Sequence, residues 1–164
     1  MELAMERANE QWERVRRYYT RFQDVNSGRH HDMVSDFYVD DILAFFQNCH
    51  HLKDWIKNDK SAPASLRADV EDYVDKHICL RICADLCNGL KHLAPNRNLK
   101  SGAQPELKGR TFGLRVGALP NSISVKQSIE HNGQVLDAFE LAMECMSAWE
   151  LFINRGVSPG VTHE

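Results

Sequence analysis

The sequence predicts an all-α fold, a four-helix-type bundle with an extra short helix and a β-hairpin inserted before the last helix. Apolar residues recur every three or four positions over most of the chain, whereas one segment alternates apolar and polar residues. Turn residues separate these segments. The 164 residues suit one domain, which we expect to cover residues 1–155 and to be followed by a disordered tail at 156–164.

Five segments have helical periodicity. The spacing predicts helices at about residues 2–25, 30–58, 65–76 and 77–93, and a last helix after Asn132-Gly133. The second of these is the clearest, because its apolar residues are alternately four and three positions apart. Those residues are Tyr38, Ile42, Phe45, Cys49, Leu52 and Ile56.

A β-hairpin is expected at about residues 110–131. In its first half, Phe112, Leu114 and Val116 alternate with polar or small residues. Residues 94–108, which precede the hairpin, lack periodicity and are expected to form a flexible loop. An isolated two-stranded hairpin is marginally stable in water, so this one should pack on the bundle, pair with a second subunit or contact a ligand.

Composition and charge exclude several classes of protein. The formal net charge of −3 gives no global attraction for nucleic acid, so any phosphate binding requires a local basic patch. No apolar run approaches the ~20 residues that span a bilayer, and the N-terminus lacks the features of a signal peptide. We therefore expect a cytoplasmic protein without membrane contact.

The cysteines also indicate a reducing compartment, because their number, five, is odd. Cys79, Cys83 and Cys87 recur every four residues on one predicted helix. A single helical row cannot enclose a tetrahedral metal ion, and the sequence has no Cys-x-x-Cys motif. We interpret these thiols as small core residues.

The helix at 77–93 carries the most informative polar residues. Arg81, Asp85, Asn88 and His92 fall within roughly 60° of one another on one helix face. A guanidinium and an amide can bind a phosphodiester, an imidazole can transfer a proton, and a carboxylate can fix the tautomer of that imidazole. The same residues are equally typical of an ordinary solvated face. Gly89, which destabilises a helix interior by about 1 kcal/mol relative to Ala, indicates that another group approaches this helix closely.

A second polar group, Asn48 and His51, lies in the predicted helix 30–58. We expect both side chains to be half-buried at a helix contact, whereas His50 and Asp54 project from the opposite, wetter side. Asn48 and His51 are either hydrogen-bonded interior residues or residues that meet the Asp85 and His92 face across the bundle.

Metal binding is a further alternative for a helical bundle. His50 with Asp54, and Asp85 with His92, could supply nitrogen and oxygen ligands. The sequence contains no Glu-x-x-His pair and no glycine-rich phosphate loop. We therefore predict no cofactor and no metal, and keep a metal-binding bundle as an alternative.

The segment Cys87-Asn88-Gly89-Leu90-Lys91-His92 resembles the motif of the HEPN superfamily, an arginine followed by a polar residue, three further residues and a histidine. The resemblance implies a small helical bundle that forms homodimers and acts in toxin–antitoxin or phage-defence systems. It also implies RNA cleavage without a metal in active members. Asn88 and His92 match the motif, whereas Cys87 occupies the position of the arginine. Arg81 lies on the same face, and Lys91 points about 100° away.

The first functional hypothesis is an RNA-binding protein that, when catalytic, is a metal-independent ribonuclease of a bacterial defence or toxin–antitoxin system. His92 would act as general acid or base, Asn88 would position the phosphate and Arg81 would stabilise its developing charge. The supporting residues would be Asp85, His51, Asn48 and Lys91.

The expected partners are RNA, a second copy of the chain, and a cognate antitoxin or another partner protein. The alternatives are a non-catalytic protein-interaction module and a metal-binding helical bundle. Large amphipathic side chains suit the dimer interface. The candidates are Trp12, Tyr18, Tyr19 and Trp149.

Overall fold

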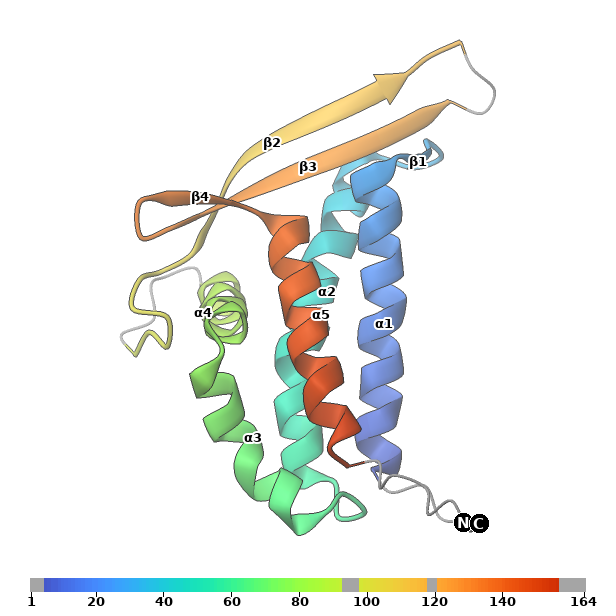
Figure 1. The fold of residues 1–164 in the computed structure, drawn as a ribbon. Coiled ribbons are helices and arrows are strands. Elements are labelled where there is room, and N and C mark those ends of the chain that lie inside the picture. Colours follow the sequence, from blue (N-terminus) through green and yellow to red (C-terminus); the bar gives the residue numbers. More distant parts are fainter. Residues whose placement is uncertain (1–4, 93–97, 118–120, 157–164) are drawn as a thin grey trace, which may run out of the picture.

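The computed structural model describes residues 5–92, 98–117 and 121–156. Within them the chain forms five helices and a four-stranded antiparallel sheet (Figure 1). The fold is therefore mixed α and β, and the all-α prediction is wrong. Residues 93–97, 118–120 and most of the expected tail, 157–164, lie outside the described residues.

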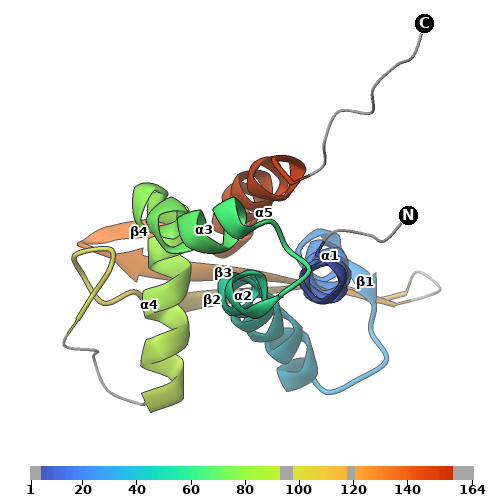
Figure 2. The same ribbon diagram turned by 90° about the horizontal axis from the view of Figure 1, so that it is seen from below.

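All five predicted helices are present, with shifted ends. They are α1 (Glu6–Ser27), α2 (Ser35–Asn58), α3 (Ala64–Lys76), α4 (Ile78–His92) and α5 (Ala138–Asn154). Helices α1, α2 and α5 run lengthwise in Figure 1, where α4 is seen along its axis, and the relation is reversed in Figure 2. Helix α4 therefore crosses the bundle, and this orientation brings its side chains against α2, α3 and α5.

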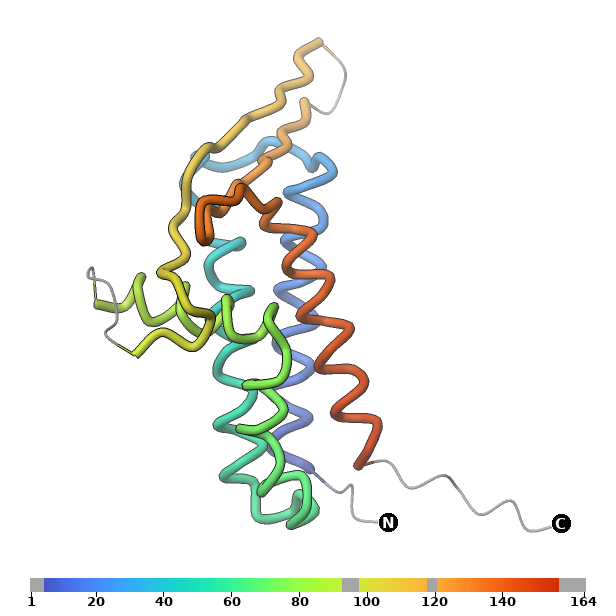
Figure 3. Tube along the Cα trace, turned by 60° about the vertical axis from the view of Figure 1, so that its left-hand side comes forward, coloured from blue at the N-terminus to red at the C-terminus, as the bar shows by residue number. Residues whose placement is uncertain are grey.

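The predicted hairpin forms the long part of the sheet, β2 (Glu106–Arg115) and β3 (Ser122–His131). Strand β3 pairs with β2 along one edge and with β1 (Arg29–His30) and β4 (Gln134–Asp137) along the other. The sheet covers one end of the bundle, and the distal part of the hairpin extends past the helices (Figures 1 and 3). The inward side chains of β3, Ile123, Val125 and Ile129, are buried.

The sequence pattern predicts the hairpin but not the two short strands that pair with it. Strand β1 has two residues, too few for an alternating pattern. The sequence pattern places strand β4 in the last helix, but Asn132 and Gly133 have φ of 52° and 75° and reverse the chain between His131 and Gln134. Helix α5 begins only after Asp137, whose side chain accepts hydrogen bonds from the backbone N–H groups of Phe139 and Glu140.

The core runs through all five helices and the inner face of β3. Trp149, expected at a dimer interface, is one of its largest buried side chains, while Trp12, Tyr18 and Tyr19 are partly buried against it. The Tyr73 hydroxyl donates to the carbonyl oxygen of Ala148 at 2.5 Å and joins α3 to α5. No helix in the described residues combines the length and the apolar character that spanning a membrane requires.

Candidate functional site

Asp85 is completely buried on α4, and its carboxylate anchors the segment that leads to β2. One carboxylate oxygen accepts from the Lys100 backbone N–H at 2.9 Å. The other accepts from the Ser101 backbone N–H at 2.7 Å and from the Ser101 hydroxyl at 2.6 Å. The Ser101 hydroxyl also lies 3.0 Å from Nε2 of His131 on β3. Asp85 therefore holds residues 100 and 101 between α4 and the sheet, and this part of the connection is not the free loop predicted.

Arg81 and Gly89 belong to the same anchored contact. A terminal nitrogen of the half-buried Arg81 donates to the Lys100 carbonyl at 3.3 Å, and its Nε is buried with no partner among the described residues. Gln104 donates from Nε2 to the carbonyl of Asp85 at 3.1 Å. A Cβ placed on Gly89 would lie 2.3 Å from that nitrogen. Gly89 was predicted to mark a group that approaches the helix closely, and that group is the side chain of Gln104.

The last two residues of the predicted catalytic face lie in the final turns of α4. Asn88 is half-buried, and His92 and its neighbour Lys91 are exposed. No hydrogen bond or ion pair joins His92 to Arg81, Asp85 or Asn88 in the described parts of the chain. Arg81 and Asp85 bind the backbone of residues 100 and 101, whereas His92 is exposed at the end of the helix. The four side chains do not form one site, and their catalytic roles stay predictions.

Asn48 and His51 do not meet the α4 face. Asn48 donates to the carbonyl of Ala44 at 2.8 Å and accepts from Nε2 of Gln11 at 3.2 Å, so it lies at the contact between α1 and α2. His51 is exposed rather than half-buried. The histidine that faces α4 is the preceding one, His50.

His50 is the residue that sequence reasoning assigned to the wrong side of α2. It lines a small internal space together with Cys49, Lys53 and Cys83. Burial, followed by the charge of Lys53, lowers the pKa of His50 to about 4, so its imidazole is neutral near pH 7. Asp54, which was the second expected metal ligand beside His50, instead forms an ion pair with Lys53, whose Nζ lies 2.7 Å from its carboxylate.

Three of the five cysteines form a buried cluster that the spacing of cysteines along α4 does not predict. All five thiols are free and buried. Cys49 of α2, Cys83 of α4 and Cys145 of α5 place their sulfur atoms within 4.8 Å of one another. They are the one group of three or more potential ligands found in the described residues. Sequence spacing within a single helix could not indicate this convergence of three helices.

The β2–β3 hairpin exposes an unusually long strand. Every residue of β2 from Lys108 to Arg115 is exposed, and the strand is the last in its sheet, so one edge lacks a pairing strand in the described chain. On one face Phe112, Leu114 and Val116 have 42%, 59% and 83% of their surface exposed. Three further apolar residues at the same end of the molecule are exposed, Met33, Val34 and Phe37. They follow His31, whose backbone N–H donates to the carbonyl of Asn121 at the start of β3.

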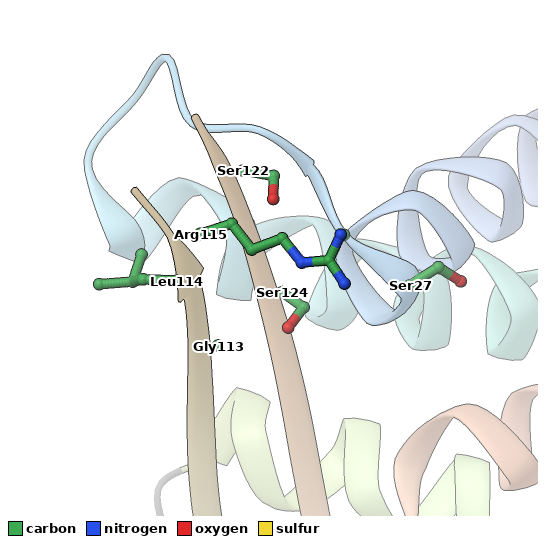
Figure 4. A pocket seen from close by; sticks show the side chains of 7 residues that line it. Ser27, Gly113, Leu114, Arg115, Ser122 and Ser124 are labelled. Atoms are coloured by element: carbon green, nitrogen blue, oxygen red, sulfur yellow. The ribbon is translucent and has the colours of Figure 1, made fainter. Parts of the chain in front are cut away.

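A polar cleft of about 460 Å³ lies between the distal part of the hairpin and the C-terminal end of α1. The Arg115 side chain extends across the strands towards Ser27 (Figure 4). No carboxylate is among the described residues that line the cleft, and a Cβ on Gly113 would lie 2.5 Å from the Ser124 hydroxyl. The lining residues are Ser27, Gly28, Gly113, Leu114, Arg115, Ser122 and Ser124. One guanidinium and three hydroxyls form a donor set that suits an anion.

Comparisons with known protein families, with curated proteins and with solved structures found no match. The resemblance to the HEPN superfamily therefore rests on the motif in α4 alone.

Proposed function

We propose that the protein is an interaction module that associates through the β2 edge of its hairpin. The single observation that carries the proposal is the exposure of both faces of β2 from Lys108 to Arg115, together with one edge that no described strand pairs. A long, exposed edge with apolar side chains is a template for pairing with another strand, and monomeric proteins shield such edges. Strand β2 has charges near its start, but its distal half combines an open edge with Phe112 and Leu114.

The preferred partner is a second copy of the chain, which gives a homodimer with a continuous sheet. An antiparallel edge pairs with its own copy about a two-fold axis. With that axis at Gly113, Phe112 lies opposite Leu114 of the partner subunit, and Arg115 lies opposite Thr111 of the partner subunit. Arg110 then lies opposite Val116 of the partner subunit. No two like charges are directly opposed, so the pairing joins apolar side chains without electrostatic repulsion.

Substitution of Leu114 tests this proposal. In Leu114→Lys a cation occupies the centre of the apolar row, as in natural edge strands that avoid pairing, and we expect a monomer by sedimentation equilibrium. Leu151→Lys is the matched control, because Leu151 is 67% exposed but lies on α5, and we expect it to leave the dimer intact. A wild-type protein that is monomeric at high concentration, or equal loss of association in both variants, would refute the proposal.

RNA binding, the activity implied by the HEPN resemblance, is the second candidate function. The observation that favours it is the cleft between the hairpin and α1, whose described lining holds Arg115 and three serines but no carboxylate and so suits a phosphate group. A defence or toxin–antitoxin role and a cytoplasmic location belong to this candidate. Buried free cysteines agree with a reducing compartment.

Labelled single-stranded RNA tests the second candidate. We expect binding that weakens with salt and that Arg115→Gln reduces, whereas Arg17→Gln, an exposed arginine on α1, leaves it unchanged. Cleavage in EDTA that is lost in His92→Gln would support the catalytic hypothesis. Binding that is insensitive to salt and to Arg115→Gln would contradict RNA recognition by this cleft.

A further inference from the structure

Three thiols from three helices meet inside the protein, in a region that the proposed docking surface does not use. Cys49, Cys83 and Cys145 are 0%, 1% and 0% exposed. Cys83 donates to the carbonyl of Phe46 at 3.4 Å, and Cys145 to the carbonyl of Cys79 at 3.5 Å. A free thiol is an acceptable core residue, so burial alone gives no function. Their mutual distance and surroundings carry the argument.

The sulfur separations suit a metal ion. Metal–sulfur bonds of about 2.3 Å place two thiolate ligands about 3.8–4.0 Å apart in tetrahedral or trigonal geometry. The three sulfurs already lie within 4.8 Å of one another. Closing around an ion therefore requires shifts of about 1 Å or less, within the range of side-chain adjustment. Helices α2, α4 and α5 fix the three positions independently of loop structure.

Trp149 provides an independent observation. Its side chain is 1% exposed, and its Nε1 has no hydrogen-bond partner among the described residues. The indole lines the same small space as Cys49 and Cys83. A buried N–H without an acceptor is costly, whereas an N–H that faces a metal-bound thiolate has a charged acceptor. The orphaned donor is therefore explained if Cys49 is a thiolate in the metal-bound protein.

The internal space next to the sulfurs gives the ion a path and one free position. It measures about 10 Å³, roughly the room for one water, and the half-buried His50 and Lys53 complete its lining on the side of α2. An ion would pass these two polar side chains and reach Cys49 and Cys83 first. The apolar remainder of the lining, Val74 and Leu80, limits access of water.

We propose that Cys49, Cys83 and Cys145 form a thiolate site for one soft metal ion, Cu(I) or Zn(II). Thiolates select these ions over Mg(II), Ca(II) or Mn(II). Cu(I) is satisfied by three thiolates, whereas Zn(II) takes a fourth ligand, for which the space beside Cys49 has room for one water. Binding replaces three S–H bonds by three metal–sulfur bonds and releases three protons, with no change of oxidation state.

The test uses the reduced protein with all 164 residues. Zn(II), or Cu(I) delivered anaerobically as a chelate, is titrated against a chromogenic competitor, and native mass spectrometry counts the bound ions. We expect one ion per chain and an ultraviolet thiolate-to-metal charge-transfer band. Cys145→Ala should weaken binding at least about 100-fold, and Trp149→Phe, which removes the N–H donor to the sulfur together with part of the buried indole, about 10- to 100-fold. Cys87→Ala, which removes a buried thiol that neighbours Cys83 without being a ligand, is the matched control and should weaken binding by no more than about tenfold.

The two arms of the titration decide which ion the site takes. One ion retained from either arm supports the site. If the wild-type protein retains neither Zn(II) nor Cu(I), the proposal is overturned and no variant is needed. It is also overturned if Cys87→Ala weakens binding as much as Cys145→Ala does. If Cys145→Ala fails to fold by circular dichroism, the wild-type stoichiometry and the folded Trp149→Phe variant decide the question.

Discussion

Replacement of Asp85 tests whether the polar face of α4 is mainly structural. The carboxylate is fully buried and accepts three hydrogen bonds at 2.9, 2.7 and 2.6 Å from residues 100 and 101. A hydrogen bond to a charged group contributes about 1.5–3 kcal/mol. In Asp85→Ala, residues 100 and 101 recover part of this energy by moving towards water. We therefore expect the free energy of unfolding to fall by about 3–5 kcal/mol, out of the roughly 5–15 kcal/mol typical of a domain.

Asp75→Ala is the matched control, because Asp75 also binds Lys100 but at the surface. Its side chain is 55% exposed and its carboxylate lies 2.7 Å from Nζ of Lys100, an ion pair that contributes about 0–1 kcal/mol. Urea unfolding followed by circular dichroism measures both variants. A loss below about 1 kcal/mol for Asp85→Ala, comparable to the control, would refute the anchoring role. RNA cleavage abolished at unchanged stability would instead assign Asp85 to catalysis.

Three further predictions concern the stability of the bundle. Because burial lowers the pKa of His50 from 6.5 to about 4, the unfolded chain binds a proton below about pH 6.5 that the folded chain does not. The metal-free protein should lose about 2 kcal/mol between pH 7 and pH 5 through this residue, a loss that urea unfolding finds absent in His50→Gln. Gly89→Ala should give no net stabilisation in the wild type, because the added Cβ displaces Gln104. In a Gln104→Ala background the same substitution should stabilise the protein by about 0.5–1 kcal/mol. A double-mutant cycle by urea unfolding measures the coupling between the two positions. Tyr73→Phe removes the bond to the Ala148 carbonyl and should lower the thermal midpoint through a loss of about 1–2 kcal/mol, measured by calorimetry; an unchanged midpoint would contradict this bond's contribution.

The helices could be predicted because each buries one continuous stripe. In α2, the residues from Tyr38 to Ile56 that follow the helical rhythm are those that the core buries. The hairpin was predictable for the analogous reason, since β3 alternates buried and less buried residues. Strand β4 was not, because its four residues continue the apolar pattern of α5, which begins directly after the Asp137 cap.

The candidate site was only partly accessible from the sequence. The helical wheel correctly placed Arg81 and Asp85 on one face, yet it could not show that residues 100–104 cover that face. For α2 the helical wheel places His50 and His51 on different sides, and the structure half-buries His50 and exposes His51. The thiol cluster depends on α4 crossing α2 and α5, a tertiary relation that no spacing within one helix encodes.

The central claim is that the open edge of β2 pairs with a second copy of the chain. Amide hydrogen exchange in β2, measured at two protein concentrations, tests this claim most directly. Between roughly 1 μM and 1 mM, we expect alternate amides from Thr111 to Arg115 to slow at least about tenfold, because edge pairing satisfies N–H groups that face water in the monomer. Amides of α2, already within a helix, should serve as an internal reference with unchanged rates. Equal and rapid exchange of the β2 edge at both concentrations would contradict the proposal.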